Sequence, residues 1–186
     1  MSYAIPADEL SLAKQEFLRR RAKEAALAKA ISLRIASAMA ELTFREAYPA
    51  NDLGVPAGTG YTNETYLTGA AVANTWTSVF NTAAVPTIGN RKIMVFYKIT
   101  DETVPAACSA VRFRLGPAGA TVLGWFHIEQ FINVKLTPEV WLSEPVVYGP
   151  SERPFIEFYP RVAVPAAGER LGFGCFVAEP TGEAVS

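Results

Sequence analysis

The sequence predicts a mainly β protein, an antiparallel β-sandwich of jelly-roll-like type preceded by a long N-terminal α-helical arm. Two observations lead to this fold class. Residues 7–46 contain neither glycine nor proline and are rich in alanine, which is typical of a helix. After Pro49, short aromatic and β-branched runs alternate with glycine and proline, which is typical of antiparallel sheets. We therefore predict an arm over 1–47, a linker over 48–60 and a sandwich over 61–186.

The predicted helix covers Ala7–Glu46. Pro6 stands before it and Asp8 and Glu9 follow, positions where proline and acidic side chains suit the positive end of the helix dipole. Pro49 ends it, because the residue before a proline avoids helical geometry. Apolar side chains spaced three and four residues apart form one stripe, which we predict to contact a partner. They are Leu27, Ile31, Ile35, Met39 and Leu42.

The predicted arm is long for the domain that carries it. Forty helical residues would span about 60 Å. The remaining residues, 47–186, should form a domain roughly 35–40 Å across. The arm therefore either bends or contacts other subunits. The basic run Arg19, Arg20 and Arg21 is a second candidate for partner contact, although such runs are commonly solvated helix faces.

Nine candidate strands follow at short intervals. They are expected over 61–68, 75–80, 92–100, 110–115, 121–129, 131–136, 141–148, 155–159 and 172–178. Apolar residues alternate with arginine in Val111–Leu115, so one face of that strand is buried. Ile93–Tyr97 and Val122–Phe126 are apolar on both faces, whereas a sandwich buries one face of each sheet. The second face needs a cover, either the helix or another chain.

Composition and charge narrow the function classes. The 17 basic and 18 acidic residues nearly cancel, which makes nucleic acid an unexpected partner. No apolar run has the length of a membrane span, and the N-terminus lacks the pattern of a secretory signal. We therefore expect a protein made in a cytoplasm. Cys108 and Cys175 are expected to be reduced, although a single bridge stays open.

Catalytic and metal-binding patterns are sparse. His127 and Glu129 would share a strand face, but a metal site needs further ligands and His127 is the only histidine. We predict no catalytic residue, no metal and no cofactor, hence no enzyme. Trp125 lies in an apolar run and is expected in the core. Trp76 and Tyr66 are the candidates for an exposed aromatic platform that could bind a glycan.

The arm, the linker over Asn51–Gly60 and the doubly apolar strands together resemble virion structural proteins of tailed bacteriophages, of the capsid decoration or cement class. The resemblance is architectural and extends over the whole chain. It implies a jelly-roll-like domain seated on a shell and an arm that braces neighbours. We therefore expect a non-enzymatic virion protein that binds a major capsid protein and copies of itself, for example as a trimer. The alternative is a carbohydrate- or receptor-binding sandwich of a phage tail.

Overall fold

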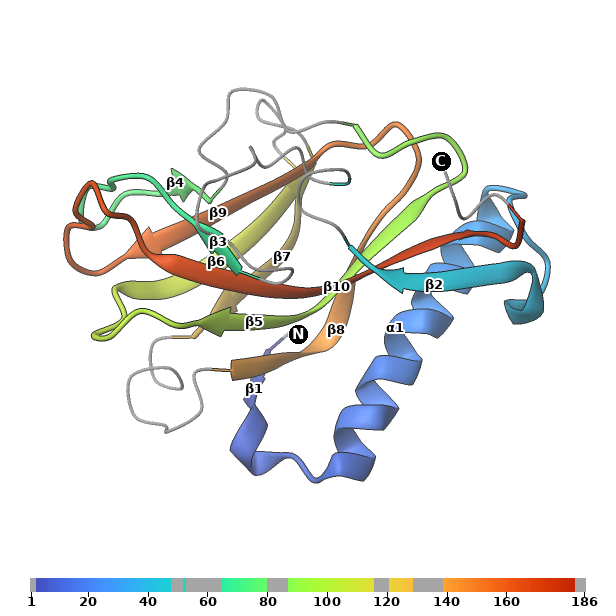
Figure 1. The fold of residues 1–186 in the computed structure, drawn as a ribbon, viewed down its shortest axis with the longest axis horizontal. Coiled ribbons are helices and arrows are strands. Elements are labelled where there is room, and N and C mark those ends of the chain that lie inside the picture. Colours follow the sequence, from blue (N-terminus) through green and yellow to red (C-terminus); the bar gives the residue numbers. More distant parts are fainter. Residues whose placement is uncertain are drawn as a thin grey trace.

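The computed structural model describes residues 3–47, 52, 65–79, 87–115, 121–128 and 139–182. Within these ranges the chain forms two antiparallel sheets and one α-helix near the N-terminus (Figure 1). The predicted mainly β, antiparallel class is confirmed. The jelly-roll connectivity stays a prediction.

One sheet has six strands in the order β1-β8-β5-β10-β2, and β3 also pairs with β10. Their bounds are Ala4–Pro6 (β1), Leu42–Glu46 (β2), Thr65–Leu67 (β3), Ile93–Asp101 (β5), Glu139–Tyr148 (β8) and Arg170–Pro180 (β10). The other sheet has four strands in the order β4-β9-β6-β7. Their bounds are Thr77–Ser78 (β4), Cys108–Leu115 (β6), Val122–His127 (β7) and Pro154–Pro160 (β9).

The larger apolar core lies between the two sheets. Phe113 of β6 packs against Phe96 of β5 and Phe173 of β10, with ring centroids 5.3 and 6.0 Å apart. All three side chains are at most 2% exposed. Cys108 and Cys175 are separate buried thiols in the same core. The inner faces of the two sheets thus pack against each other.

Strand β5 explains the doubly apolar run in the sequence. Met94 and Phe96 face the intersheet core, while Ile93, Val95 and Tyr97 belong to a second core cluster on the opposite face. The register with β8 shifts between Phe96 and Lys98, a β-bulge that alters the alternation along the strand. The second apolar face is therefore covered within one chain.

Helix α1 (Leu12–Ser32) provides that cover by packing on β5 and β8 (Figure 1). Its buried side is a stripe of small residues in which Ala22, Ala26 and Ala30 are 0% exposed. Opposite the stripe, Tyr97 stacks on Phe176 at 4.6 Å and lies 5.5 Å from Trp141. Alanine lets the helix axis approach closely, so the wide aromatic rings fill the space between helix and sheet.

The prediction of one helix over Ala7–Glu46 is wrong at both ends. Ser11 caps the helix N-terminus by accepting a hydrogen bond from the Lys14 amide at 3.3 Å. At the C-terminus Arg34 has a φ of 57°, a left-handed conformation that usually takes glycine. The Arg34 and Ile35 amides then donate to Ile31 and Ala30 carbonyls at 3.0 and 2.9 Å, which closes the helix. Because an arginine occupies this position, the sequence carries no glycine stop signal.

The chain on both sides of α1 joins the six-stranded sheet. Ala4–Pro6 forms edge strand β1, and Leu42–Glu46, predicted as helix, forms edge strand β2. Most of the predicted strands after residue 60 correspond to observed ones. The predicted strand 131–136 and, apart from Asp52, the predicted linker 48–60 lie outside the described residues. In the described part of the chain, no helix has the length and hydropathy that crossing a membrane requires.

Candidate binding surface

The outer face of the four-stranded sheet carries a cluster of aromatic and ionic side chains, which we call the aromatic face. Its members are Trp76, Arg112, Arg114, Val122, Leu123, Trp125, His127, Phe155, Glu157 and Tyr159. Arg112 of β6 lies directly opposite Trp125 of β7 and Glu157 of β9 in the strand register. Since residues paired in this way project to the same side of a sheet, three strands contribute to one surface.

Trp76 lies at the centre of the aromatic face. Its ring centroid is 5.5 Å from that of Trp125 and 5.2 Å from that of Tyr159. The guanidinium carbon of Arg112 lies 4.2 Å from the Trp76 centroid, within cation–π distance. Trp76 therefore bridges β9 and β7 above the middle strand β6. The small Ala110, paired with both Tyr159 and His127, is only 3% exposed beneath this cluster.

Glu157 holds two arginines on the same face. The Arg112 Nε donates to Glu157 Oε2 at 2.6 Å, and the Arg114 Nη1 donates to the same oxygen at 3.1 Å. Burial by itself would raise the pKa of Glu157, but hydrogen bonds from the two arginines outweigh it, so the pKa is lowered. Two guanidinium groups thus share one carboxylate oxygen on this face.

Strand β7 exposes the most apolar surface of the aromatic face. Trp125 is 49% exposed, and Val122 and Leu123 are 45% and 37% exposed. The Trp125 ring stacks on His127 at 5.7 Å. The prediction that Trp125 lies in the core is wrong, because Phe126 and Gly124 face inward. A Cβ on Gly124 would lie 2.8 Å from the Phe126 ring.

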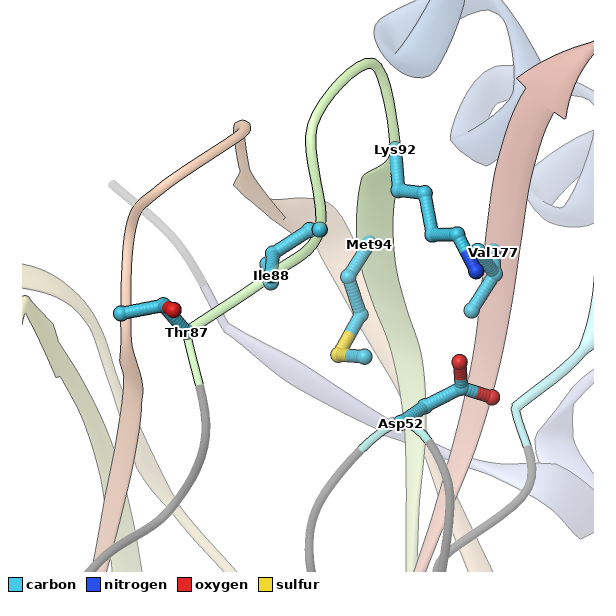
Figure 2. A pocket seen from close by; sticks show the side chains of 7 residues that line it. Asp52, Thr87, Ile88, Lys92, Met94 and Val177 are labelled. Carbon is cyan, nitrogen blue, oxygen red and sulfur yellow. The ribbon is translucent and has the colours of Figure 1, made fainter. Parts of the chain in front are cut away.

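A pocket of about 180 Å³ lies beside β5 and β10 (Figure 2). Its lining combines apolar Ile88, Met94 and Val177 with Asp52 and Lys92. The ionic groups at this pocket are already paired. Arg45 contacts Asp52 and Glu179 at 2.7 Å each, and Lys92 contacts Glu179 at 3.3 Å. A charged ligand would have to displace these partners, which makes the pocket a weaker candidate than the aromatic face.

The predicted basic run does not form one surface. The Arg19 Nη2 donates to the Tyr97 hydroxyl at 3.4 Å, and the Arg21 Nη1 donates to the Ser143 carbonyl at 3.2 Å. Arg20 lies on the outward side of α1 and pairs with Glu24 at 3.5 Å. Residues 19 and 21 are about 200° apart on a helix, so they reach strands on the two sides of it.

The predicted partner-binding stripe is divided as well. Leu42 is buried in β2, and Leu27 and Ile35 are half-buried against the core between α1 and the sheet. Ile31 is 50% exposed on α1, and Met39 is half-buried in a 3-10 turn. The sequence pattern missed that alanine, the smallest apolar residue, forms the buried stripe.

The two glycan candidates lie apart in the sheets. Trp76 is part of the aromatic face, whereas Tyr66 is placed by its backbone in β3, opposite Leu171 of β10. His127 contacts Trp125, and Glu129 lies outside the described residues. The described part of the chain contains no group of three or more His, Cys, Asp or Glu side chains placed to hold a metal ion.

Comparisons of the chain with protein-family models, with curated proteins and with solved structures found no significant match.

Proposed function

We propose that this chain is a non-enzymatic structural protein that binds a protein lattice through the aromatic face, as a capsid decoration or cement protein of a phage virion does. The observation that carries the proposal is the exposed row of Trp125, Leu123 and Val122 beside Arg112 and Arg114. Tryptophan, tyrosine and arginine are the residues that most often dominate protein–protein binding energy. The proposal also includes a jelly-roll-like topology for the sandwich, self-association, for example as a trimer, and a location in the virion.

In this proposal the four-stranded sheet, and not the N-terminal helix, makes the lattice contact. The sequence favoured a projecting arm, but α1 packs against its own sheet through Ala22, Ala26 and Ala30. Residues buried there are committed to the fold. Large side chains stay exposed on β7, at the edge of the four-stranded sheet. The lattice contact is therefore assigned to that sheet.

The test is cosedimentation of the purified chain with shells assembled from a candidate major capsid protein. We expect saturable binding that falls at least tenfold, which corresponds to about 1.4 kcal/mol, in Trp125→Ala and Leu123→Ser. Because both side chains are substantially exposed, thermal melting should stay close to that of the unchanged protein.

Ile31→Ser is the matched control, since Ile31 is as exposed as Trp125 but lies on α1. It should bind the shells like the unchanged chain. Loss of binding in Ile31→Ser with normal binding in Trp125→Ala would assign the contact to the helix and reject the aromatic face. Absence of binding to any shell tested, together with a strictly monomeric state in sedimentation velocity, would count against a lattice protein.

Glycan binding is the second candidate, supported by the grouping of Trp76, Trp125 and Tyr159 within 5.2–5.5 Å. One point weakens it. Arg112 and His127 lie over the Trp76 and Trp125 rings, which reduces the flat surface that a sugar ring needs for stacking. A glycan array with hits that disappear in Trp76→Ala and Trp125→Ala would favour this function over the lattice contact.

A further inference from the structure

Two acidic side chains are buried together where β5 and β10 meet the connection to β6. Asp101 ends β5, Glu169 precedes β10, and both residues are 1% exposed. Buried carboxyl groups are rare unless their oxygens are satisfied or one of them is neutral. We call Asp101 and Glu169 the buried carboxyl pair.

Hydrogen bonds connect the buried carboxyl pair to three segments of the chain. Glu169 Oε1 accepts from the Ala107 and Cys108 amides at 2.7 and 2.8 Å. The Glu169 amide donates to the Thr68 hydroxyl at 2.9 Å, next to β3. Asp101 Oδ1 accepts from the Thr103 amide at 3.0 Å. The pair thus fastens the β5–β6 connection to the ends of β3 and β10.

One oxygen of each carboxyl group lacks a donor. Asp101 Oδ2 and Glu169 Oε2 are buried and have no hydrogen-bond partner among the described residues. The neighbouring ionisable side chains contact other groups. The Cys108 thiol points to the Ala110 carbonyl, Arg161 donates to the Ala106 carbonyl, and Glu102 pairs with Arg170 at the exposed rim. Within the described ranges, neither Arg161 nor Arg170 pairs with either carboxyl group.

We propose that Asp101 and Glu169 share one proton between these two oxygens at neutral pH. The protonated Asp101 Oδ2 donates to Glu169 Oε2, which supplies the missing hydrogen bond and removes one buried negative charge. The β5–β6 connection is then held closed by a contact that exists only while the proton is bound. This makes the corner a pH-sensitive fastening of the fold, independent of what the aromatic face binds.

The shared proton makes the free energy of unfolding fall as pH rises. Burial, followed by the hydrogen bond and charge of Glu169, raises the pKa of Asp101 from 3.8 to about 9. Between these values the folded chain keeps a proton that the unfolded chain has lost. The stabilisation is complete below the unfolded value and is lost as pH rises toward the folded value. The unfolding equilibrium constant should increase up to about tenfold per pH unit in this window.

The other groups with a shifted pKa affect stability outside the middle of this pH window. The lowered pKa of Glu157 affects stability only near and below its usual value of 4.5. The pKa of Cys108, Cys175 and Tyr148 is raised above ordinary values of 9 to 10, so these groups matter only at more alkaline pH. The interval from about pH 5.5 to about pH 8 therefore isolates the buried carboxyl pair.

The experiment measures urea unfolding of the full chain across this interval. The unchanged protein should lose stability steadily as pH rises. In Asp101→Asn, the amide supplies a permanent donor to Glu169, so the slope should disappear. In Glu169→Gln, the amide supplies a donor to Asp101 from the other side and should remove the slope as well. Glu102→Gln, one residue along and exposed, is the control and should keep the slope.

Other results would reject the hypothesis that the two carboxyl groups share a proton. An unchanged protein whose stability is flat from about pH 5.5 to about pH 8 rejects it, as does a slope that persists in both amide variants. A melting temperature that rises with added calcium or magnesium at pH 8, and falls with a chelator, would mean that the two oxygens hold a cation instead. If Asp101→Asn does not fold, the decision rests on Glu169→Gln.

Discussion

The two sheets each have an outer face, and the chain covers these faces in different ways. The six-stranded sheet is covered by α1, whose alanine stripe lies against Tyr97, Trp141 and Phe176. Among the residues that the structure describes, the outer face of the four-stranded sheet is covered by Trp76 and by the side chains around Glu157. A helix excludes water along its full length, whereas the second cover leaves Trp125 half exposed.

The two outer faces are expected to contribute differently, one to stability and the other to binding. Apolar area removed from water stabilises the fold, at about 25 cal/mol per Å², so the helix-covered face contributes to folding. Apolar area left in water can contribute when a partner covers it. Substitutions on the first face should therefore change unfolding, and substitutions at the open edge of the second should mainly change association.

The largest expected effect is at the helix-covered face. Ala26→Leu adds three carbons where Ala26 is 0% exposed, and we expect a loss of about 3 kcal/mol in the free energy of unfolding. Chemical denaturation measures it. Ala28→Leu, on the exposed side of the same helix, should change stability by less than about 0.5 kcal/mol. Equal effects of the two variants would mean that the helix is not seated on the sheet.

Trp76 and Trp125 divide the aromatic face into a packed part and an open part. Trp76→Ala removes the ring that joins Trp125, Tyr159 and Arg112, and we expect it to cost about 2 kcal/mol because Trp76 is half-buried. Trp125→Ala should cost less than about 1 kcal/mol. Thermal melting of the two variants, side by side, checks this order. The reverse order would place the packing role on Trp125.

Glu157→Gln tests the ionic part of the aromatic face. Arg112 and Arg114 would lose their shared carboxylate, and we expect a loss of about 1 kcal/mol at neutral pH, since both arginines are partly solvated. Because the pKa of Glu157 is lowered in the folded chain, the stabilisation by Glu157 is present above about pH 4.5 and is lost as pH falls. The gap between the unchanged protein and the variant should narrow in acid. Glu24→Gln, a surface pair on α1, should show neither effect.

The smallest effect expected is a gain, at the end of the helix that covers the first face. Arg34 has a φ of 57°, so Arg34→Gly removes backbone strain and should stabilise the chain by about 0.5–1 kcal/mol. Within the same helix Arg20→Gly should destabilise by about 1 kcal/mol. Denaturation midpoints measure both. A loss of stability in Arg34→Gly would show that the arginine side chain itself holds the helix end.

Local patterns predicted the strands well. The alternation of Val111–Leu115 gave a strand whose Phe113 is buried and whose Arg112 and Arg114 lie on the outer face. The doubly apolar run Ile93–Tyr97 is indeed buried on both faces. These features depend on side-chain alternation and on glycine and proline breakers, which act over a few residues.

The helix boundaries and the binding surface were decided by contacts between distant segments. The chain continues after Ser32 as a turn and then as β2, because Leu42–Glu46 pairs with Phe176–Pro180 of β10, far along the chain. Trp125 is exposed because Phe126 takes the inward place in β7, which a run of apolar letters does not reveal.

The sequence by itself therefore determined the class of fold and the positions of most strands. Only the tertiary structure decided that the helix lies on its own sheet and that the four-stranded sheet offers the exposed aromatic side chains. The physical reason is that secondary structure follows local periodicity, while exposure depends on which surfaces the rest of the chain covers.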